Sequence, residues 1–361
     1  LEKYLDLADS ASTIQELLDA TVLIESETGM NPLLGFGPST DLLDSNKYSL
    51  YGSGLSTGLP RDYILMGNPQ VDAMYEGLVA QFLALSGIPG EEAVEKAGKL
   101  YDLERIIAAS TMSNEEASRV ENVYNPVSRA DLAKMFPYVD MGKYLDDLEY
   151  GSAKEIIVTD VNLMKKTGEL LSDENLDTLK TYVRFGLLVN TASLLSQDFR
   201  DAIMAFQRTF YGISTSLSDE DIAFNTLNSV MASYLGRMYV EKYFSAEAKK
   251  DVESIVADII ATFKKRIEAL DWMSPATKEK AISKLNSIKV KVGYPDKWED
   301  PLAGISIKTY KDGGSLLGNV FAISSASAKE SKSLLSKPVD KTKWLMPPHT
   351  VNAYYNATNN E

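Results

Sequence analysis

Apolar residues recur at steps of three and four over much of the chain, and this period predicts a mainly α-helical protein. The longest such pattern covers residues 246–270. Its apolar positions form one stripe along the expected helix: Val252, Ile255, Val256, Ile259, Phe263, Ile267 and Leu270. A stripe of this kind is typical of a helix that covers a hydrophobic core with one face.

Capping residues mark the starts of several predicted helices. Ser128 stands three residues before Asp131, and Ser218 three residues before Asp221, which is the spacing of a helix N-terminus. Ser274 precedes a proline, which suits the first helical position. Further helices are expected from Ser12 or Thr13, over residues 70–85 and 91–109, and from Ser172.

A few short strands interrupt the helical pattern. Residues 39–63 combine β-prone positions with turn-forming glycines, and residues 156–158 are a short apolar run that favours a strand or a buried linker. Over residues 288–292, isoleucine and valine alternate with lysine, which predicts a strand with one face in water.

The composition changes near residues 336–344, and we place a domain boundary there. Pro347 and Pro348 force an extended chain, and residues 350–355 are β-prone and contain two tyrosines. We therefore predict a mainly helical domain over residues 1–338, a large multi-helix body with a few short strands. Residues 339–361 are predicted to form an extended segment with a strand.

The charge of the chain limits its partners. The 361 residues include 51 acidic side chains against 37 lysines and arginines, which gives a formal net charge of −14 at pH 7. Such a field repels phosphates, so we expect no nucleic-acid partner. No uncharged apolar run reaches the roughly 18 residues of a membrane-spanning helix. The acidic first nine residues do not have the pattern of a signal peptide, and the chain starts at Leu1, which is compatible with a segment upstream.

The chain has no cysteine and one histidine, His349. Disulfides, thiolate nucleophiles and cysteine-based metal sites are thereby excluded. A zinc site with two histidines cannot form within these residues, and Pro348 prevents a regular helix through His349. We predict no catalytic residue and no metal ligand in the chain, and interpret His349 as a loop residue.

Other candidate motifs carry little weight. Gly52, Gly54 and Gly58 lack the spacing of a nucleotide-binding loop and indicate turns. Residues 356–358 match the Asn-x-Thr pattern of N-glycosylation, but a tripeptide is a weak signal. No pair stands out among the 51 carboxylates, so a two-carboxylate glycosidase is neither indicated nor excluded. Composition and period alone indicate a large, acidic, helical protein.

Four segments of the chain occur in an order similar to that of a known family. They are residues 58–63 (GLPRDY), residues 123–132 (VYNPVSRADL), a long string over residues 235–244, 272–281 and 292–296, and residues 351–356 (VNAYYN). Together they resemble the N-terminal region of the neprilysin and endothelin-converting-enzyme family of zinc endopeptidases. The first segment is one residue shorter than the family's Gly-Leu-Pro-x-Arg-Asp-Tyr-Tyr pattern.

The resemblance implies a fold and a function. In that family a helical domain closes over a thermolysin-like α+β catalytic domain, and the enclosed chamber admits peptides but not folded proteins. Residues 1–338 would then be the lid and chamber domain, and residues 339–361 the first edge strand of a catalytic domain. The family's Asn-Ala pair, which binds the backbone of the peptide substrate, corresponds to Asn352 and Ala353.

The resemblance also has a gap. The family's zinc motif, His-Glu-x-x-His with a downstream Glu, does not occur in these residues. The resemblance therefore implies that this chain is the N-terminal portion of an enzyme and is inactive alone. Its partner would be a C-terminal catalytic segment, and zinc would be the cofactor of the complete enzyme. Two alternatives stay open: a non-catalytic helical peptide-binding module, and a scaffold protein on the same fold. The lack of cysteine favours a bacterial member. The compartment stays open, with the cell envelope or secretion favoured over the cytoplasm.

Overall fold

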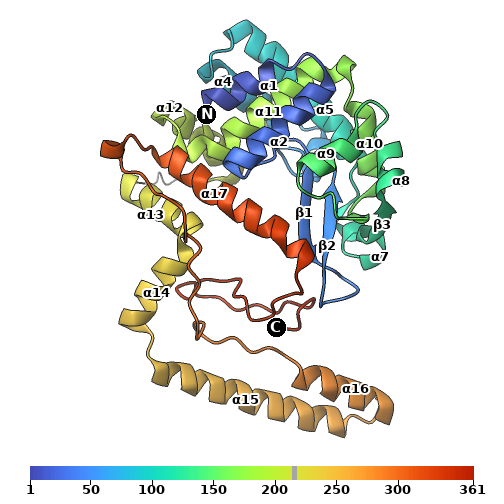
Figure 1. Ribbon diagram of the computed structural model, residues 1–361, viewed down its shortest axis with the longest axis vertical. Coiled ribbons are helices and arrows are strands. Elements are labelled where there is room, and N and C mark those ends of the chain that lie inside the picture. Colours follow the sequence, from blue (N-terminus) through green and yellow to red (C-terminus); the bar gives the residue numbers. More distant parts are fainter. Residues whose placement is uncertain (214–217) are drawn as a thin grey trace. The chain divides into compact units, whose positions relative to one another are not determined.

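The computed structural model describes residues 1–213 and 218–361 (Figure 1). Helices dominate, as the sequence pattern predicts, and the strands are few and short. The chain divides into two compact units. The first unit comprises Leu1–Ser39, Tyr48–Ser218 and Ile305–Lys337. The second unit comprises Thr40–Lys47, Asp219–Gly304 and Pro338–Glu361.

The first unit contains most of the helices. They are α1 (Glu2–Asp9), α2 (Ile14–Thr28), α3 (Arg61–Met66), α4 (Pro69–Leu85), α5 (Gly90–Ser110), α6 (Asn114–Ala117), α7 (Val120–Val123), α8 (Arg129–Lys134), α9 (Met141–Asp147), α10 (Val161–Leu170), α11 (Leu176–Thr191), α12 (Gln197–Tyr211) and α17 (Leu316–Ser333). Short 3₁₀ turns are η1 (Asp173–Asn175), η2 (Ala192–Leu194), η3 (Tyr310–Asp312) and η4 (Leu334–Ser336). Two predicted caps are confirmed, because Thr13 accepts from the Glu16 amide and Ser128 from the Asp131 amide.

A four-stranded sheet belongs to the first unit. Its strands are β1 (Gly35–Thr40), β2 (Tyr48–Ser53), β3 (Asn125–Ser128) and β4 (Glu155–Val158), in the order β1-β2-β4-β3. Strands β2 and β4 run parallel, with Leu50 opposite Ile156, and β3 is antiparallel to β4. The apolar run at residues 156–158 is therefore a central strand, and its three side chains are buried.

Part of the core of the first unit lies among α4, α5, α11 and α12. Phe82 on α4 is fully buried and packs edge-on against Phe185 of α11, with ring centroids 5.9 Å apart. It makes a similar contact with Phe199 of α12 at 5.4 Å. Full burial of one such side chain contributes roughly 1.5–3 kcal/mol. These contacts hold three helices of the unit, α4, α11 and α12, together.

Helix α17 returns the chain to the first unit and lies along α2 (Figure 1). The Ser325 hydroxyl donates to the Ser26 carbonyl at 2.5 Å. Lys332 forms an ion pair with Glu25 at 2.9 Å, and only 9% and 10% of the two side chains is exposed. The sequence pattern did not predict α17, and these two contacts, between residues about 300 positions apart, are tertiary.

The second unit contains four helices: α13 (Asp219–Val230), α14 (Ala232–Tyr243), α15 (Ala246–Ala269) and α16 (Pro275–Asn286). The predicted helices at residues 246–270 and after Ser274 are confirmed, with Ser245 and Ser274 as caps. The prediction of a strand over residues 288–292 is wrong. A strand needs a paired neighbour, and this segment instead donates from the Lys289 amide to the Asn360 carbonyl at 2.9 Å.

Candidate functional site

The second unit brings together several of the segments that carry the resemblance. Phe244, which follows α14, lies edge-on to Tyr294, with ring centroids 5.8 Å apart. Gly293 has a φ of +68°, and a Cβ there would approach the Phe244 ring to 2.2 Å, so glycine is required at this position. Lys249 on α15 binds both the Tyr294 carbonyl and Asp296, each at 2.8 Å. The hydrogen bond from Lys249 lowers the pKa of Asp296.

The segment after residue 338 packs against this scaffold. Pro348 lies on α14 beside Gly236, where a Cβ would stand 2.5 Å from the proline ring. His349 lies in a turn, and its Nε2 is 2.6 Å from the side-chain oxygen of Asn228 on α13. Its Nδ1 is buried and has no hydrogen-bond partner among the described residues. The single histidine thus fastens the segment to α13.

Asn352 and Ala353, the predicted substrate-binding pair, are exposed. They line a hollow of about 330 Å³ together with residues 288–291, Trp344 and Tyr354. The Asn352 side-chain oxygen accepts from the Ala353 amide at 2.8 Å. Residues 351–355 have no regular secondary structure. A strand forms only when another backbone pairs with it, so the edge strand proposed for this segment stays a prediction.

The end of the segment is held by a buried ion pair. Lys291 pairs with Glu361, and the two side chains are 12% and 1% exposed. The Lys291 ammonium also donates to the Lys343 carbonyl at 2.6 Å. Asn360 donates to the Lys284 carbonyl of α16 at 3.1 Å. The segment is therefore tied to α13 at His349 and to α16 at Asn360, while residues 351–353 between them are exposed.

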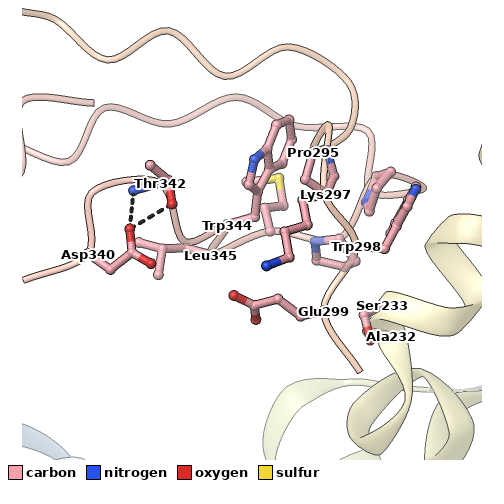
Figure 2. Close-up of a pocket in the computed structure, with 13 residues that line it drawn as sticks. Ala232, Ser233, Pro295, Lys297, Trp298, Glu299, Asp340, Thr342, Trp344 and Leu345 are labelled. Carbon is pink, nitrogen blue, oxygen red and sulfur yellow. Dashed lines mark hydrogen bonds between the residues drawn. The ribbon is translucent and has the colours of Figure 1, made fainter. Parts of the chain in front are cut away.

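A second hollow of about 390 Å³ lies next along the same segment (Figure 2). Its walls include Trp298, Trp344 and three prolines. Figure 2 shows the charged ends of Lys297 and Glu299 projecting into the space near Asp340. Asp340 accepts from the amide and hydroxyl of Thr342 at 2.8 and 2.6 Å, and these hydrogen bonds lower its pKa. Apolar walls with a few charged groups are typical of ligand-binding pockets.

The first unit contains a buried carboxyl group that the sequence did not single out. Glu104 on α5 accepts from the Tyr75 hydroxyl at 2.9 Å and from the Gly58 amide at 3.2 Å. Its other oxygen is buried without a partner among the described residues. Burial raises the pKa of Glu104 to about 7, against the opposing effect of both hydrogen bonds. The available signal was its helical spacing, which places Glu104 on the same side of α5 as Leu100 and Ile107.

The segment at residues 58–63 is therefore anchored to α5. Gly58 binds Glu104, and the Arg61 side chain donates to the Thr111 carbonyl at 2.9 Å. These contacts assign the segment a structural role in the first unit. In the described parts of the chain, no group of three or more acidic or histidine side chains is placed to hold a metal ion. No described helix is long and apolar enough to cross a membrane.

The sequence matches the model of peptidase family M13, for the N-terminal part of the family, over residues 1–295. The chain belongs to peptidase family M13. A neutral endopeptidase of Lactobacillus helveticus is 29% identical over 329 residues, which are 90% of this chain and 50% of that protein. Endothelin-converting enzyme-like 1 of Rattus norvegicus is 28% identical over 307 residues, 82% of this chain and 39% of that protein.

A solved M13 structure has the same fold. The zinc metalloprotease Zmp1 of Mycobacterium tuberculosis, in complex with an inhibitor, superimposes with a TM-score of 0.85 at 27% identity. The match covers 98% of this chain and 53% of Zmp1. The chain thus spans about half, or less, of the length of these relatives. The resemblance inferred from the four sequence segments is confirmed, and so is the mainly helical fold that it implies.

Proposed function

We propose that this chain is the N-terminal portion of a zinc-dependent endopeptidase that cleaves peptides within an enclosed chamber. The single observation that carries the proposal is the M13 match over residues 1–295, with relatives that are neutral endopeptidases and endothelin-converting enzymes. Residues 1–338 would supply the lid and chamber wall. Residues 339–361 would begin the catalytic domain, and the enzyme would act in the bacterial cell envelope or after secretion.

The residues of this chain do not fit a zinc ion. His349 is the one histidine, and it is committed to Asn228 in a turn. We infer that the zinc ligands belong to a C-terminal catalytic segment, supplied by the same polypeptide or by a second chain. The 361 residues alone would then bind no zinc and cleave no peptide.

Asn352 and Ala353 are proposed to bind the backbone of the substrate. Three properties support this: both residues are exposed, both border a hollow, and the surrounding backbone is not engaged in a sheet. An asparagine amide can donate to one peptide group and accept from another. A peptide in extended conformation could add alongside residues 351–355 by backbone hydrogen bonds.

A peptidase assay tests the function. The product of the complete gene, read to its stop codon, should cleave an unfolded peptide, lose that activity to a chelator and recover it with zinc. The 361-residue chain should show none. If the complete product binds no zinc and cleaves nothing, the function is instead that of a non-catalytic peptide-binding or scaffold protein.

A substitution tests the site. In the complete product, Asn352→Ala should lower kcat/KM by about 10- to 100-fold, the equivalent of about 1.4–2.7 kcal/mol for hydrogen bonds made to the substrate. Asn225→Ala, the same substitution at an exposed position of α13 that does not border this hollow, is the matched control and should change kcat/KM less than about twofold. Equal effects of the two substitutions on kcat/KM would contradict the proposal that Asn352 binds the substrate.

A further inference from the structure

The first unit contains a hollow of about 330 Å³ that is lined by the buried acid Glu104, and we call it the Glu104 hollow. Glu104, Tyr182 and Phe185 lie at its inner side and are 2%, 8% and 5% exposed. Its border includes the exposed residues Ser56 and Asn190. None of the described residues that line it is a lysine, an arginine or a histidine. An ionised Glu104 therefore has no counter-charge within the hollow.

The fold uses one of the two carboxyl oxygens of Glu104. The Tyr75 hydroxyl and the Gly58 amide both donate to Oε1, whereas Oε2 is buried without a partner among the described residues. A Cβ at Gly58 would approach the Tyr75 hydroxyl to 1.9 Å, so the loop reaches this position only with glycine. A glutamine would offer its carbonyl oxygen to the same two donors and would bury no charge. The two contacts explain an acceptor at this position, but they do not explain a carboxyl group.

The lining of the hollow indicates the kind of ligand. A buried carboxylate oxygen without a donor is costly, and a cation that donates hydrogen bonds offsets this cost best. Pro32, Phe185 and Val189 give the hollow an apolar side. A metal ion does not fit, because no group of three or more acidic or histidine side chains is placed to hold one in the described parts of the chain. An ammonium group on a short aliphatic chain matches both the acid and the apolar side.

We propose that the Glu104 hollow binds the ammonium group of a small primary amine, with the Glu104 carboxylate as its counter-ion and the aliphatic chain of the amine against Phe185 and Val189. The lining residues all belong to the first unit. The inference goes beyond the proposed function, because binding of an amine requires neither zinc nor the cleavage of a peptide bond.

Binding should depend on pH, because the ammonium group pairs with the ionised carboxylate. Burial raises the pKa of Glu104 to about 7, so this group is mostly ionised at pH 8 and mostly protonated at pH 6. The titratable groups that face it are Tyr75 of α4 and Tyr182 of α11, whose pKa values burial raises above 10, so both stay neutral. Helices α3 and α10 also pack on α5 but contribute no lining residue. An alkylammonium stays protonated up to a pH of about 10, as lysine does.

The test uses n-butylammonium chloride as the probe and n-butanol as its neutral analogue. Isothermal titration calorimetry on the 361-residue chain, at constant ionic strength, measures the dissociation constant at pH 8 and at pH 6. We expect n-butylammonium to bind at pH 8 with a dissociation constant on the order of 1 mM, within the limit for a ligand of about five heavy atoms. The affinity should be about tenfold lower at pH 6, and n-butanol should not bind at these concentrations.

Three variants separate the hollow from the acidic surface of the chain. Glu104→Gln keeps the acceptor and removes the charge, so it should weaken n-butylammonium binding at least tenfold at pH 8 and abolish the pH dependence. Glu95→Gln, the same substitution at an exposed position of α5, should change the dissociation constant less than about twofold. Gly186→Leu adds a side chain to the hollow from α11 and leaves Glu104 in place, and it should also weaken binding at least tenfold.

Two results would overturn the proposal. One is equal binding of n-butylammonium by Glu104→Gln and the unchanged chain, and the other is equal binding of n-butanol and n-butylammonium. Either would leave Oε2 to a water molecule. If circular dichroism shows that Glu104→Gln does not fold, Gly186→Leu decides, and an unchanged affinity there overturns the proposal as well.

A second probe, Nα-acetyl-lysine amide, distinguishes two sources of the ammonium group. Tighter binding than that of n-butylammonium would assign the hollow to a lysine side chain of a peptide. Binding at least tenfold weaker would assign it to a free amine.

Discussion

The two units are built from the same kind of amphipathic helix but differ in how much apolar surface is covered. In the first unit Phe82 and Tyr144 are fully buried. In the second unit α13, α15 and α16 contain no buried residue, and Phe263 is 56% exposed. The period of three and four is equally clear in both. Periodicity therefore predicts a helix and its apolar side, but it does not show whether the partner of that side is in the same chain.

The largest expected effect is on the free energy of unfolding, when phenylalanine is replaced by alanine in each of the two units. Phe82→Ala should lower the free energy of unfolding of the first unit by about 3–5 kcal/mol, because it leaves a cavity among α4, α11 and α12. Phe263→Ala removes a half-exposed ring and should change the stability of the 361-residue chain by less than about 0.5 kcal/mol, as for most surface substitutions.

Tryptophan fluorescence makes this comparison sharp. All three tryptophans, Trp272, Trp298 and Trp344, belong to the second unit. In urea titrations, Phe82→Ala should shift the transition seen by far-ultraviolet circular dichroism and should leave the fluorescence transition near its original midpoint. An equal shift in both signals would mean that the two units unfold together, and it would contradict the prediction that they unfold independently.

The next effect concerns the ion pair that fastens α17 to α2. Lys332→Met should lower the stability of the first unit by about 2–3 kcal/mol, because it leaves the nearly buried Glu25 carboxylate without its cation. Lys329→Met, on the same helix but exposed, is the control and should have almost no effect. Urea unfolding followed by circular dichroism measures both. Equal midpoints would show that packing alone holds α17 in place.

The third prediction uses the pH dependence of Glu104. Burial raises its pKa from 4.5 to about 7, so the folded state binds this proton more tightly than the unfolded state. The stabilising contribution is present below about pH 4.5 and is lost as the pH rises through 7, a change of about 3 kcal/mol at 1.36 kcal/mol per pKa unit.

Glu104→Gln should remove this dependence. Relative to the unchanged chain, the variant should gain up to about 3 kcal/mol of stability between pH 5 and pH 8. Glu279→Gln, an exposed acid in the second unit, should leave the pH profile of the first unit unchanged. Stability measured by urea titration at each pH gives both profiles. Parallel profiles for Glu104→Gln and the unchanged chain would contradict the assignment of Glu104 as a buried group with a raised pKa.

Local signals account for the parts of the fold that were predicted correctly. The caps at Thr13, Ser128 and Ser274 each satisfy a backbone amide within three residues, so the sequence contains the whole interaction. The strand at residues 288–292 was predicted wrongly for the opposite reason. Alternation describes one strand, whereas a strand exists only with a second one beside it.

The candidate site shows the same contrast between local signals and contacts that only the folded chain creates. Asn352 and Ala353 were selected because residues 351–356 resemble a family segment, and no local physical rule distinguishes them from other exposed polar and small residues. Glu104 was missed because its importance comes from burial between Tyr75 and Gly58, which lie 29 and 46 residues away. Its spacing of four and three residues from Leu100 and Ile107 was the trace of it in the sequence.

Local patterns in the sequence predict the helical class, several helix starts and the family, because caps, periodicity and colinear motifs are properties of neighbouring residues. Tertiary structure alone decided that α17 returns to α2, that Glu104 is buried and that one face of α15 stays open. Each of these depends on contacts between segments far apart in the chain, and free energies of burial are set by the final neighbours of a side chain rather than by its neighbours in sequence.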